Sequence, residues 1–210
     1  MAKAHIHVMF KLESDVNDYV KTKLTALGLK KLIDFNEESG MSDYMKEALK
    51  GSAKTKDKTS FGKPDFHIEK YSVPIVIEDK LGIKHHIAEN KSGIRMDEKA
   101  VREYAVNGAI YYAKNMIASK KYDEVIAIGI SGDNEDNVKI SVYYVFSPSI
   151  PPKEMTDYVT LDFVQNQDSF NAFYKAATVT DEERHRILVK SREEILKHAK
   201  KLNTLMNNHN

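Results

Sequence analysis

The stretch GKPDFHIEKYSVPIVIEDK, residues 62–80, contains two strand-like segments joined by the short connection YSVP. The first segment opens on Asp65, directly after a proline. The second is an apolar run that ends abruptly on three charges, Glu78, Asp79 and Lys80. Two such runs around a turn predict an antiparallel hairpin. A turn centred near Ser72 places Asp65 roughly opposite Asp79, so the charges of both strands converge at one end of the hairpin.

This convergence has a chemical interpretation and a simpler alternative. Strand side chains alternate between faces, so Glu78 and Lys80 are expected on one face and Asp79 on the other. Asp65 and Glu78 could hold a hard divalent cation through oxygen ligands, as phosphodiester hydrolysis requires. Lys80 could orient or deprotonate the attacking water, or stabilise the pentavalent phosphate. The alternative is that the strand simply emerges into solvent and takes on charged residues there. Such a run of charges is common by chance in a chain of which 30% of the residues are charged.

The rest of the chain predicts helices around this hairpin. Helical spacing of apolar residues within the stretch 15–31 predicts a helix that ends near Gly28. A shorter helix is predicted over residues 41–49. A long amphipathic helix follows at residues 97–117, and then two strands at 123–131 and 138–146. We therefore predict an α/β fold with a mixed β-sheet flanked by helices.

A lysine-rich segment, residues 50–63, precedes the hairpin. Its Gly, Ser, Thr and Asp content predicts a loop. Such a loop is either a solvated connector or a contact to a phosphate backbone.

The chain has a boundary signal at SPSIPP, residues 147–152, and a helical region after it. A short helix is predicted around residues 170–176, and a long one opens on TDEE, where Thr180 and Glu183 form a capping-box pattern. One seam of this C-terminal helix is apolar and needs a partner; it carries Leu188, Ile195, Ala199, Leu202 and Met206.

Composition excludes several classes of protein. The 210 residues contain no cysteine, which excludes disulfides and Cys-ligated zinc or iron–sulfur sites. Lys and Arg (32) nearly balance Asp and Glu (31), so affinity for nucleic acid must come from local clusters. We find no signal peptide or membrane-spanning stretch, which favours a cytoplasmic protein.

The segments PDF, residues 64–66, and IVIEDK, residues 75–80, resemble the signature of the PD-(D/E)XK nuclease superfamily. The following VREYAVNGAIYYAKNM and EVIAIGISG resemble the N-terminal endonuclease domain of type IIG and type I restriction-modification enzymes. Those enzymes often carry Q-x-x-x-Y on this helix, and here Asn107 and Tyr111 stand at that spacing, with asparagine in place of glutamine. The resemblance covers roughly residues 15–146.

The resemblance implies a set of site residues. It implies that Mg²⁺, with Mn²⁺ as the alternative ion, is bound by Asp65, Glu78 and the backbone carbonyl of Asp79, and that Lys80 is catalytic. It also implies an acidic residue from the first helix, for which we choose Asp18 over Glu47. Of Tyr111 and Tyr112, one is expected to pack on the sheet and the other to reach the site or the DNA, and we choose Tyr111 as the catalytic candidate. Ordinary loop or surface roles are expected for His67, His85 and His86.

The resemblance also implies a domain organisation and partners. Residues 1–150 would form the nuclease core, and residues 151–210 a helical extension or linker toward a methyltransferase domain. Methyltransferase and target-recognition domains would belong to the same full-length chain, with double-stranded DNA as substrate and a transient dimer for double-strand cleavage. The alternatives are a stand-alone recombination or repair nuclease of the same superfamily, and a catalytically silent DNA-binding module.

Overall fold

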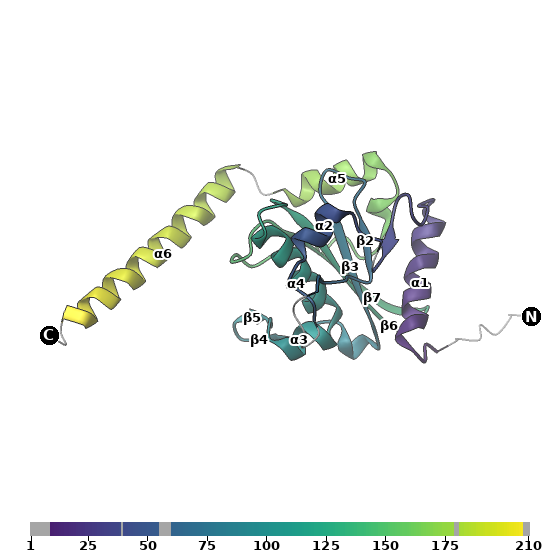
Figure 1. Cartoon of the computed structure of the whole chain (residues 1–210), viewed down its shortest axis with the longest axis horizontal. Coiled ribbons are helices and arrows are strands. Elements are labelled where there is room, and N and C mark those ends of the chain that lie inside the picture. The colour runs from purple at the N-terminus through teal and green to yellow at the C-terminus, as the bar shows by residue number, and fades with distance from the viewer. Residues whose placement is uncertain (1–8, 39, 55–59, 179–180, 208–210) are drawn as a thin grey trace, which may run out of the picture. The chain divides into compact units, whose positions relative to one another are not determined.

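The computed structural model describes residues 9–38, 40–54, 60–178 and 181–207 (Figure 1). The chain divides into two compact units, residues 1–173 and 174–210. Within the described ranges, no helix is long and apolar enough to cross a membrane.

The first unit is built on a mixed six-stranded sheet in the order β1-β2-β3-β6-β7-β8 (Figure 1). Its strands are β1 (Asn36–Glu37), β2 (Phe66–Ile68), β3 (Ile75–Leu81), β6 (Val125–Asn134), β7 (Asn137–Val145) and β8 (Lys153–Glu154). β3 and β6 run parallel, and the other neighbours run antiparallel. A separate small hairpin pairs β4 (Glu89–Asn90) with β5 (Gly93–Ile94). The predicted mixed sheet is confirmed.

Helices flank this sheet, as predicted. They are α1 (Glu13–Ala26), α2 (Asp43–Ala48), α3 (Glu98–Glu103), α4 (Ala105–Ala118) and α5 (Gln167–Ala177), with the 3-10 turns η1 (Ile83–His85) and η2 (Asp162–Val164). α1 buries Val16, Val20 and Leu24 at helical spacing, and the chain leaves it through Gly28 at φ +86°. Only glycine adopts this backbone conformation without strain, which explains the stop after α1.

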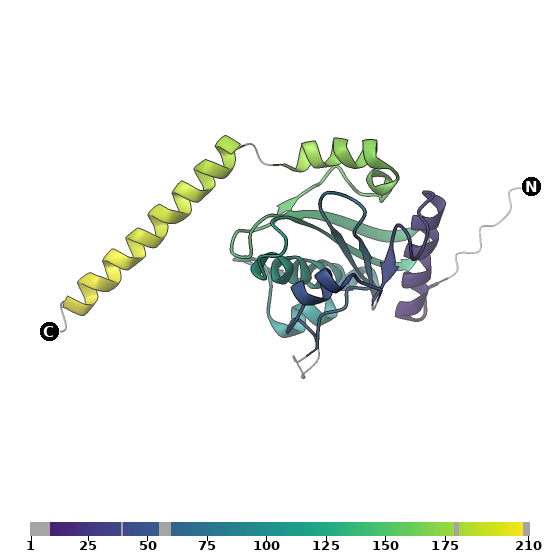
Figure 2. The same ribbon diagram turned by 45° about the horizontal axis from the view of Figure 1, so that its top comes forward.

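Strand β3 contacts two helices, α4 and α1, and Figure 2 shows α4 lying along one side of the sheet. α4 packs on the sheet face that carries Val76, Ala127 and Tyr143. Because strand side chains alternate, Ile77 and Asp79 point to the other face, and α1 packs against β3 there. The carboxyl end of β3 is therefore reached from both helices.

The predicted hairpin is confirmed, with one change of register. Phe66 pairs with Ile77, so the continued register puts Asp65 across from Glu78 rather than Asp79. The reason is that the connection is centred between Tyr71 and Ser72, half a residue before the centre expected from the sequence. The three charges still end the strand beside Asp65.

The single helix predicted over residues 97–117 is interrupted. Tyr104 has an extended backbone (φ −124°, ψ 132°) between α3 and α4. Just after this break, the Val106 N–H donates to the His86 carbonyl at 2.9 Å. Gly129 of β6 makes room for this contact, because a Cβ there would lie 2.5 Å from Val106 Cγ2. The break therefore lets the start of α4 sit directly on the sheet.

The chain continues to cover the sheet after SPSIPP. β8 pairs with β7. The Tyr71 hydroxyl donates to the Val164 carbonyl at 2.6 Å, and the Tyr71 ring stacks on Phe170 with centroids 4.1 Å apart. The division into a nuclease core of residues 1–150 and an extension of residues 151–210 remains a prediction.

The second unit contains the predicted C-terminal helix, α6 (Asp181–Asn207). Ile195 and Leu202 on its apolar seam are exposed, as is the neighbouring Leu196. Thr180 and the side chains of Glu183, Leu188 and Met206 lie outside the described residues.

Candidate active site

The charged residues that end β3 meet the segment before β2. Glu78 and Asp79 are buried, and Asp65 is half-buried. The backbone N–H of Asp79 donates to Asp65 Oδ2 at 2.8 Å, which ties the two segments together.

Three carboxylates crowd at this point. Glu13, the first residue of α1, joins Asp65 and Asp79, and one oxygen from each lies within 4.8 Å of the others. Carboxylate oxygens at such spacing can share one hard cation. Neither Asp18 nor Glu78 belongs to this group of three. Glu13 was missed in the sequence because an acidic residue in a first helical turn also suits the helix dipole.

Asp79, the most buried carboxylate of the group, lacks the hydrogen-bond donors that a buried carboxylate needs. Neither oxygen of Asp79 receives a hydrogen bond from the described residues. Burial, and then the neighbouring Glu78 charge, raise the pKa of Asp65, while burial and the Asp65 charge raise the pKa of Asp79. A buried carboxylate without a partner is costly. The observed residues therefore fit a divalent cation, which would supply the missing positive charge.

Lys80 lies next to this group. Its Nζ donates to Glu13 Oε1 at 2.5 Å and to the Asp79 carbonyl oxygen at 2.8 Å, and lies 3.8 Å from Glu78 Oε2. Burial opposes the charge of Lys80, but Glu78, Asp65 and Glu13 together outweigh it and raise its pKa. Lys80 is thus an ammonium ion. In this structure it uses the Asp79 carbonyl that the resemblance assigns to the metal.

Glu78 has a second lysine partner that the sequence did not single out. Its Oε2 accepts a hydrogen bond from Lys54 Nζ at 2.5 Å, and the same ammonium lies 4.4 Å from the centre of the Tyr112 ring. Lys54 comes from the lysine-rich loop, where no spacing distinguishes it from its neighbours. Lys56 and Lys58 of that loop lie outside the described residues.

The charges of the whole constellation do not balance. Four carboxylates, Glu13, Asp65, Glu78 and Asp79, face the two ammonium groups of Lys54 and Lys80. The formal charge is therefore two units negative, which matches one divalent cation. Burial is the main cause of the raised pKa values of Asp65 and Asp79, and the neighbouring carboxylate charges add to it.

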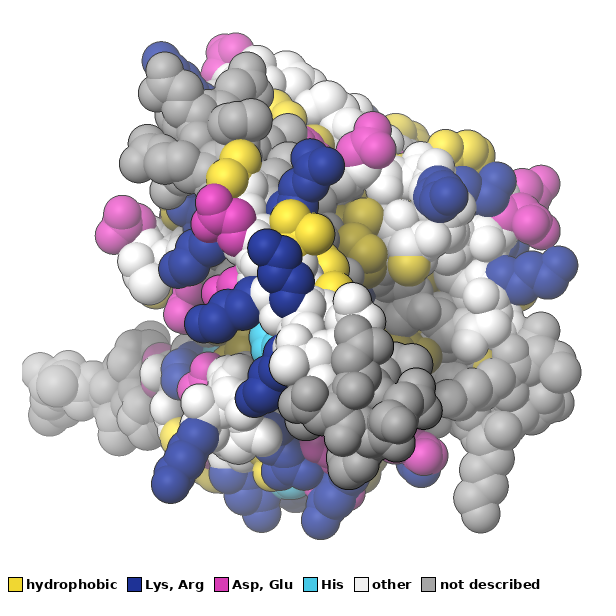
Figure 3. All heavy atoms as spheres, turned by 90° about the vertical axis from the view of Figure 1, so that its left-hand side faces the viewer, with side chains coloured by type: hydrophobic (Ala, Val, Ile, Leu, Met, Phe, Trp, Pro, Cys, Tyr) yellow, Lys and Arg dark blue, Asp and Glu magenta, His cyan; other side chains and the backbone are white. Residues whose placement is uncertain are grey.

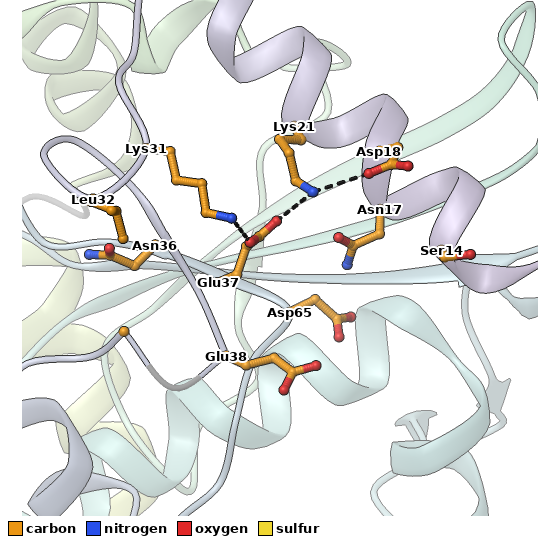
Figure 4. A pocket seen from close by; sticks show the side chains of 11 residues that line it. Ser14, Asn17, Asp18, Lys21, Lys31, Leu32, Asn36, Glu37, Glu38 and Asp65 are labelled. Carbon is orange, nitrogen blue, oxygen red and sulfur yellow. Dashed lines mark hydrogen bonds and ion pairs between the residues drawn. The ribbon is translucent and has the colours of Figure 1, made fainter.

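A cleft opens beside Asp65 (Figure 4). It has a volume of about 560 Å³ and is lined by Ser14, Asn17, Asp18, Lys21, Lys31, Leu32, Asn36, Glu37, Glu38, Gly40 and Asp65. Asp18 is 74% exposed and pairs with Lys21 at 3.1 Å, and Lys21 also pairs with Glu37 at 2.8 Å. The structure therefore places Asp18 in the cleft and outside the carboxylate group.

The remaining sequence candidates occupy different places. Glu47 is exposed on α2. Tyr111 is half-buried at the edge of the core, whereas Tyr112 is buried and contacts Lys54. Asn107 is fully buried and holds the backbone of Ala88 and Arg95 through its side-chain amide.

The three histidines are outside the carboxylate group. His86 is buried between Ser131 Oγ and Ser141 Oγ, 2.9 Å from each. Burial, and then the charge of Lys139, lower the pKa of His86 to about 4. His67 is buried and His85 is half-exposed.

Comparison with known proteins connects this chain to restriction-modification. It is similar to the type II restriction enzyme and methyltransferase RM.BcgI of Heyndrickxia coagulans, with 33% identity over 149 residues, which is 70% of this chain. The matched region spans 23% of that relative, so the chain corresponds to about a quarter of its length. No protein-family model and no solved structure matches the chain.

Proposed function

We propose that this chain is the nuclease domain of a restriction-modification protein, and that it hydrolyses phosphodiester bonds of double-stranded DNA with Mg²⁺. The carrying observation is the group of three crowded carboxylates, Glu13, Asp65 and Asp79, which lies beside the ammonium of Lys80 and in which Asp79 has no hydrogen-bond donor among the described residues. The similarity to a restriction enzyme supports the reaction class.

The proposed ion ligands combine sequence and geometry. Asp65 and Glu78 keep the roles that the PD-(D/E)XK resemblance gives them, with the Asp79 carbonyl. We add as further candidate ligands the carboxylates of Glu13 and Asp79, which meet Asp65 on the other face of β3 from Glu78. Mg²⁺, or Mn²⁺ in its place, would supply Lewis acidity and lower the pKa of a bound water. These side chains would hold the ion beside Lys80.

Lys80 is proposed to stabilise negative charge rather than to accept a proton. Its raised pKa keeps it positive, and its Nζ is fixed by Glu13 and by the Asp79 carbonyl. A fixed positive charge stabilises a phosphate whose charge grows in the transition state.

DNA contacts are proposed to come from local groups of lysines. Figure 3 shows Lys and Arg side chains interspersed with acidic ones on the face drawn, without one continuous basic area. Lys21 and Lys31 on the rim of the cleft are candidates. Methyltransferase and target-recognition domains in the same full-length chain, and a transient dimer for double-strand cleavage, remain part of the proposal.

Two alternatives are less well supported. A stand-alone recombination or repair nuclease would use the same residues, but the relative found combines restriction and methylation in its name. A silent DNA-binding module would have no need for a cluster of carboxylates, with Asp79 left without a donor, next to the partly buried Lys80.

The test combines plasmid cleavage with calorimetry. Wild-type protein should cut plasmid DNA with Mg²⁺ and not with EDTA. Lys80→Ala should lower cleavage by about 10²–10³-fold, the effect of losing one preorganised charge contact, while ion binding persists. Asp65→Ala should abolish both. Lys99→Ala, at an exposed lysine of α3, is the control and should cut normally. A Lys80→Ala protein that cuts at the wild-type rate would overturn the proposal.

A further inference from the structure

We propose that Lys54 is a displaceable counter-ion of Glu78, which holds this carboxylate in the ion-free protein and is displaced when a divalent cation binds. The inference rests on the proposed function. It assigns a role in ion binding to a residue from the lysine-rich loop.

The contact between Lys54 and Glu78 is close and shielded from solvent. Lys54 Nζ lies 2.5 Å from Glu78 Oε2, and the two side chains are 15% and 2% exposed. Lys80 Nζ is farther from the same oxygen, at 3.8 Å. Lys54 is therefore the principal cation on Glu78.

Helix α4 leaves space beside the Lys54–Glu78 contact, because it has a glycine, Gly108, at that point. Gly108 lies within α4, where glycine is less favourable than alanine by about 1 kcal/mol. A Cβ at Gly108 would lie 2.5 Å from Lys54 Nζ and 3.1 Å from Glu78 Oε2. The absence of a side chain at Gly108 is thus what lets Lys54 reach Glu78.

The Tyr112 ring is the third group that surrounds the Lys54 ammonium. Tyr112 follows Gly108 by one helical turn, and its ring centre lies 4.4 Å from Lys54 Nζ, a cation–π distance. The chain returning from the loop lies on the same ring, because a Cβ at Gly62 would be 2.5 Å from Tyr112 Cε1. Carboxylate, helix gap and ring together form a site for one cationic side chain.

Lys54, rather than Lys80, is the lysine that a divalent cation would displace. Lys80 stems from β3 itself and is also held by Glu13 and by the Asp79 carbonyl. Lys54 stems from a loop, and its contacts among the described side chains are Glu78 and the Tyr112 ring. A divalent cation on Glu78 repels both ammonium groups, and the less constrained one yields.

The test is calorimetric titration of the whole chain with MnCl₂ after treatment with EDTA. Lys54→Met keeps the aliphatic stem and removes the charge, and it should bind Mn²⁺ about fivefold more tightly than wild type. Lys54→Arg keeps the charge and should bind as wild type does. Lys50→Met, at an exposed lysine of the same loop, is the matched control and should also bind as wild type.

Thermal unfolding provides a second readout. Lys54→Met should lower the melting temperature in EDTA, because Glu78 loses its counter-ion, and Mn²⁺ should raise it by more than in wild type. A merely structural lysine would lower the melting temperature equally with and without Mn²⁺ and leave the affinity unchanged.

The outcomes separate this inference from the proposed function. Wild-type protein that binds no Mn²⁺ overturns both. Wild-type protein that binds Mn²⁺, with Lys54→Met binding equally or more weakly, overturns the role of Lys54 alone. If Lys54→Met does not fold, Lys54→Gln, which keeps a hydrogen-bond donor without the charge, decides by the same comparison.

Discussion

Two buried polar clusters on the same sheet differ in how their hydrogen-bonding needs are met. His86 has a serine hydroxyl at 2.9 Å from each ring nitrogen. Asp79 is equally buried, yet neither of its carboxylate oxygens has a donor among the described residues. A satisfied cluster contributes to the fold, whereas an unsatisfied one requires something that the chain does not supply. In this pair, His86 is a structural residue and Asp79 a candidate site residue.

Asn107 falls into the satisfied class. Its amide donates to the carbonyls of Ala88 (2.8 Å) and Arg95 (2.6 Å), and its oxygen accepts from the Ala88 N–H at 2.9 Å. It thus fastens the loop before α3 to α4. Asn107, at the position where the sequence resemblance would place glutamine, therefore has a structural role in this chain.

The largest expected effect is the loss of stability when the hydrogen bonds of Asn107 are removed. Asn107→Ala should lower the free energy of unfolding by about 3–4 kcal/mol, because three buried hydrogen bonds are lost and backbone groups are left unpaired. Urea denaturation measures this. Asn115→Ala removes a half-buried hydrogen bond to the Tyr111 carbonyl and should cost about 1 kcal/mol. Equal costs for the two variants would contradict the structural role of Asn107.

His86 makes a prediction about acid stability. Its pKa is lowered to about 4 in the folded protein, against an unfolded value near 6.5, so its contribution to stability is present above pH 6.5 and is lost as the pH falls toward 4. The loss should amount to about 3 kcal/mol between pH 7 and pH 4. His86→Gln should remove this part of the pH dependence in urea denaturation, and His85→Gln should leave it. Parallel curves for wild type and His86→Gln would show that His86 does not titrate this way.

A smaller effect is expected on Mn²⁺ affinity, and it distinguishes two carboxylates of α1, Glu13 and Asp18. Glu13→Gln should weaken Mn²⁺ binding about tenfold in calorimetry, because one of the three crowded carboxylates is lost, whereas Asp18→Asn should change it by less than about twofold. The reverse order would restore Asp18 as the first-helix ligand.

The smallest expected effect is a stabilisation of the ion-free protein when Asp79 is replaced by asparagine. Because the pKa of Asp79 is raised, the stability of the ion-free protein should fall as the pH rises from the unfolded value near 3.9 through the folded pKa. Asp79→Asn should therefore be more stable than wild type in EDTA at pH 8, by about 1 kcal/mol, and no more stable at pH 4. Urea denaturation at the two pH values measures the difference. If Asp79→Asn destabilises the protein at pH 8, the carboxylate has a partner and the contrast with His86 fails.

The sequence predicts some of these features because they are local. The alternation of Glu78, Asp79 and Lys80 and their pairing with the Asp65 segment follow from strand geometry over fewer than twenty residues. Glu13 and Lys54 could not be found this way, because their roles depend on where α1 and a loop pack against β3. The break at Tyr104 has the same origin, since a contact with the sheet overrides helical periodicity.

The parallel pairing of β3 with β6 has a consequence for the order in which the protein gains its chemistry. Ile75 pairs with Ile126, so the central pair of the sheet can close only after some fifty intervening residues have been synthesised. The carboxylates come from Glu13, Asp65 and the end of β3, and they meet only when α1 rests on that pair. A nascent or partly unfolded chain therefore keeps these charges apart. Any ability to cut DNA would arise late in folding and would be lost early in unfolding.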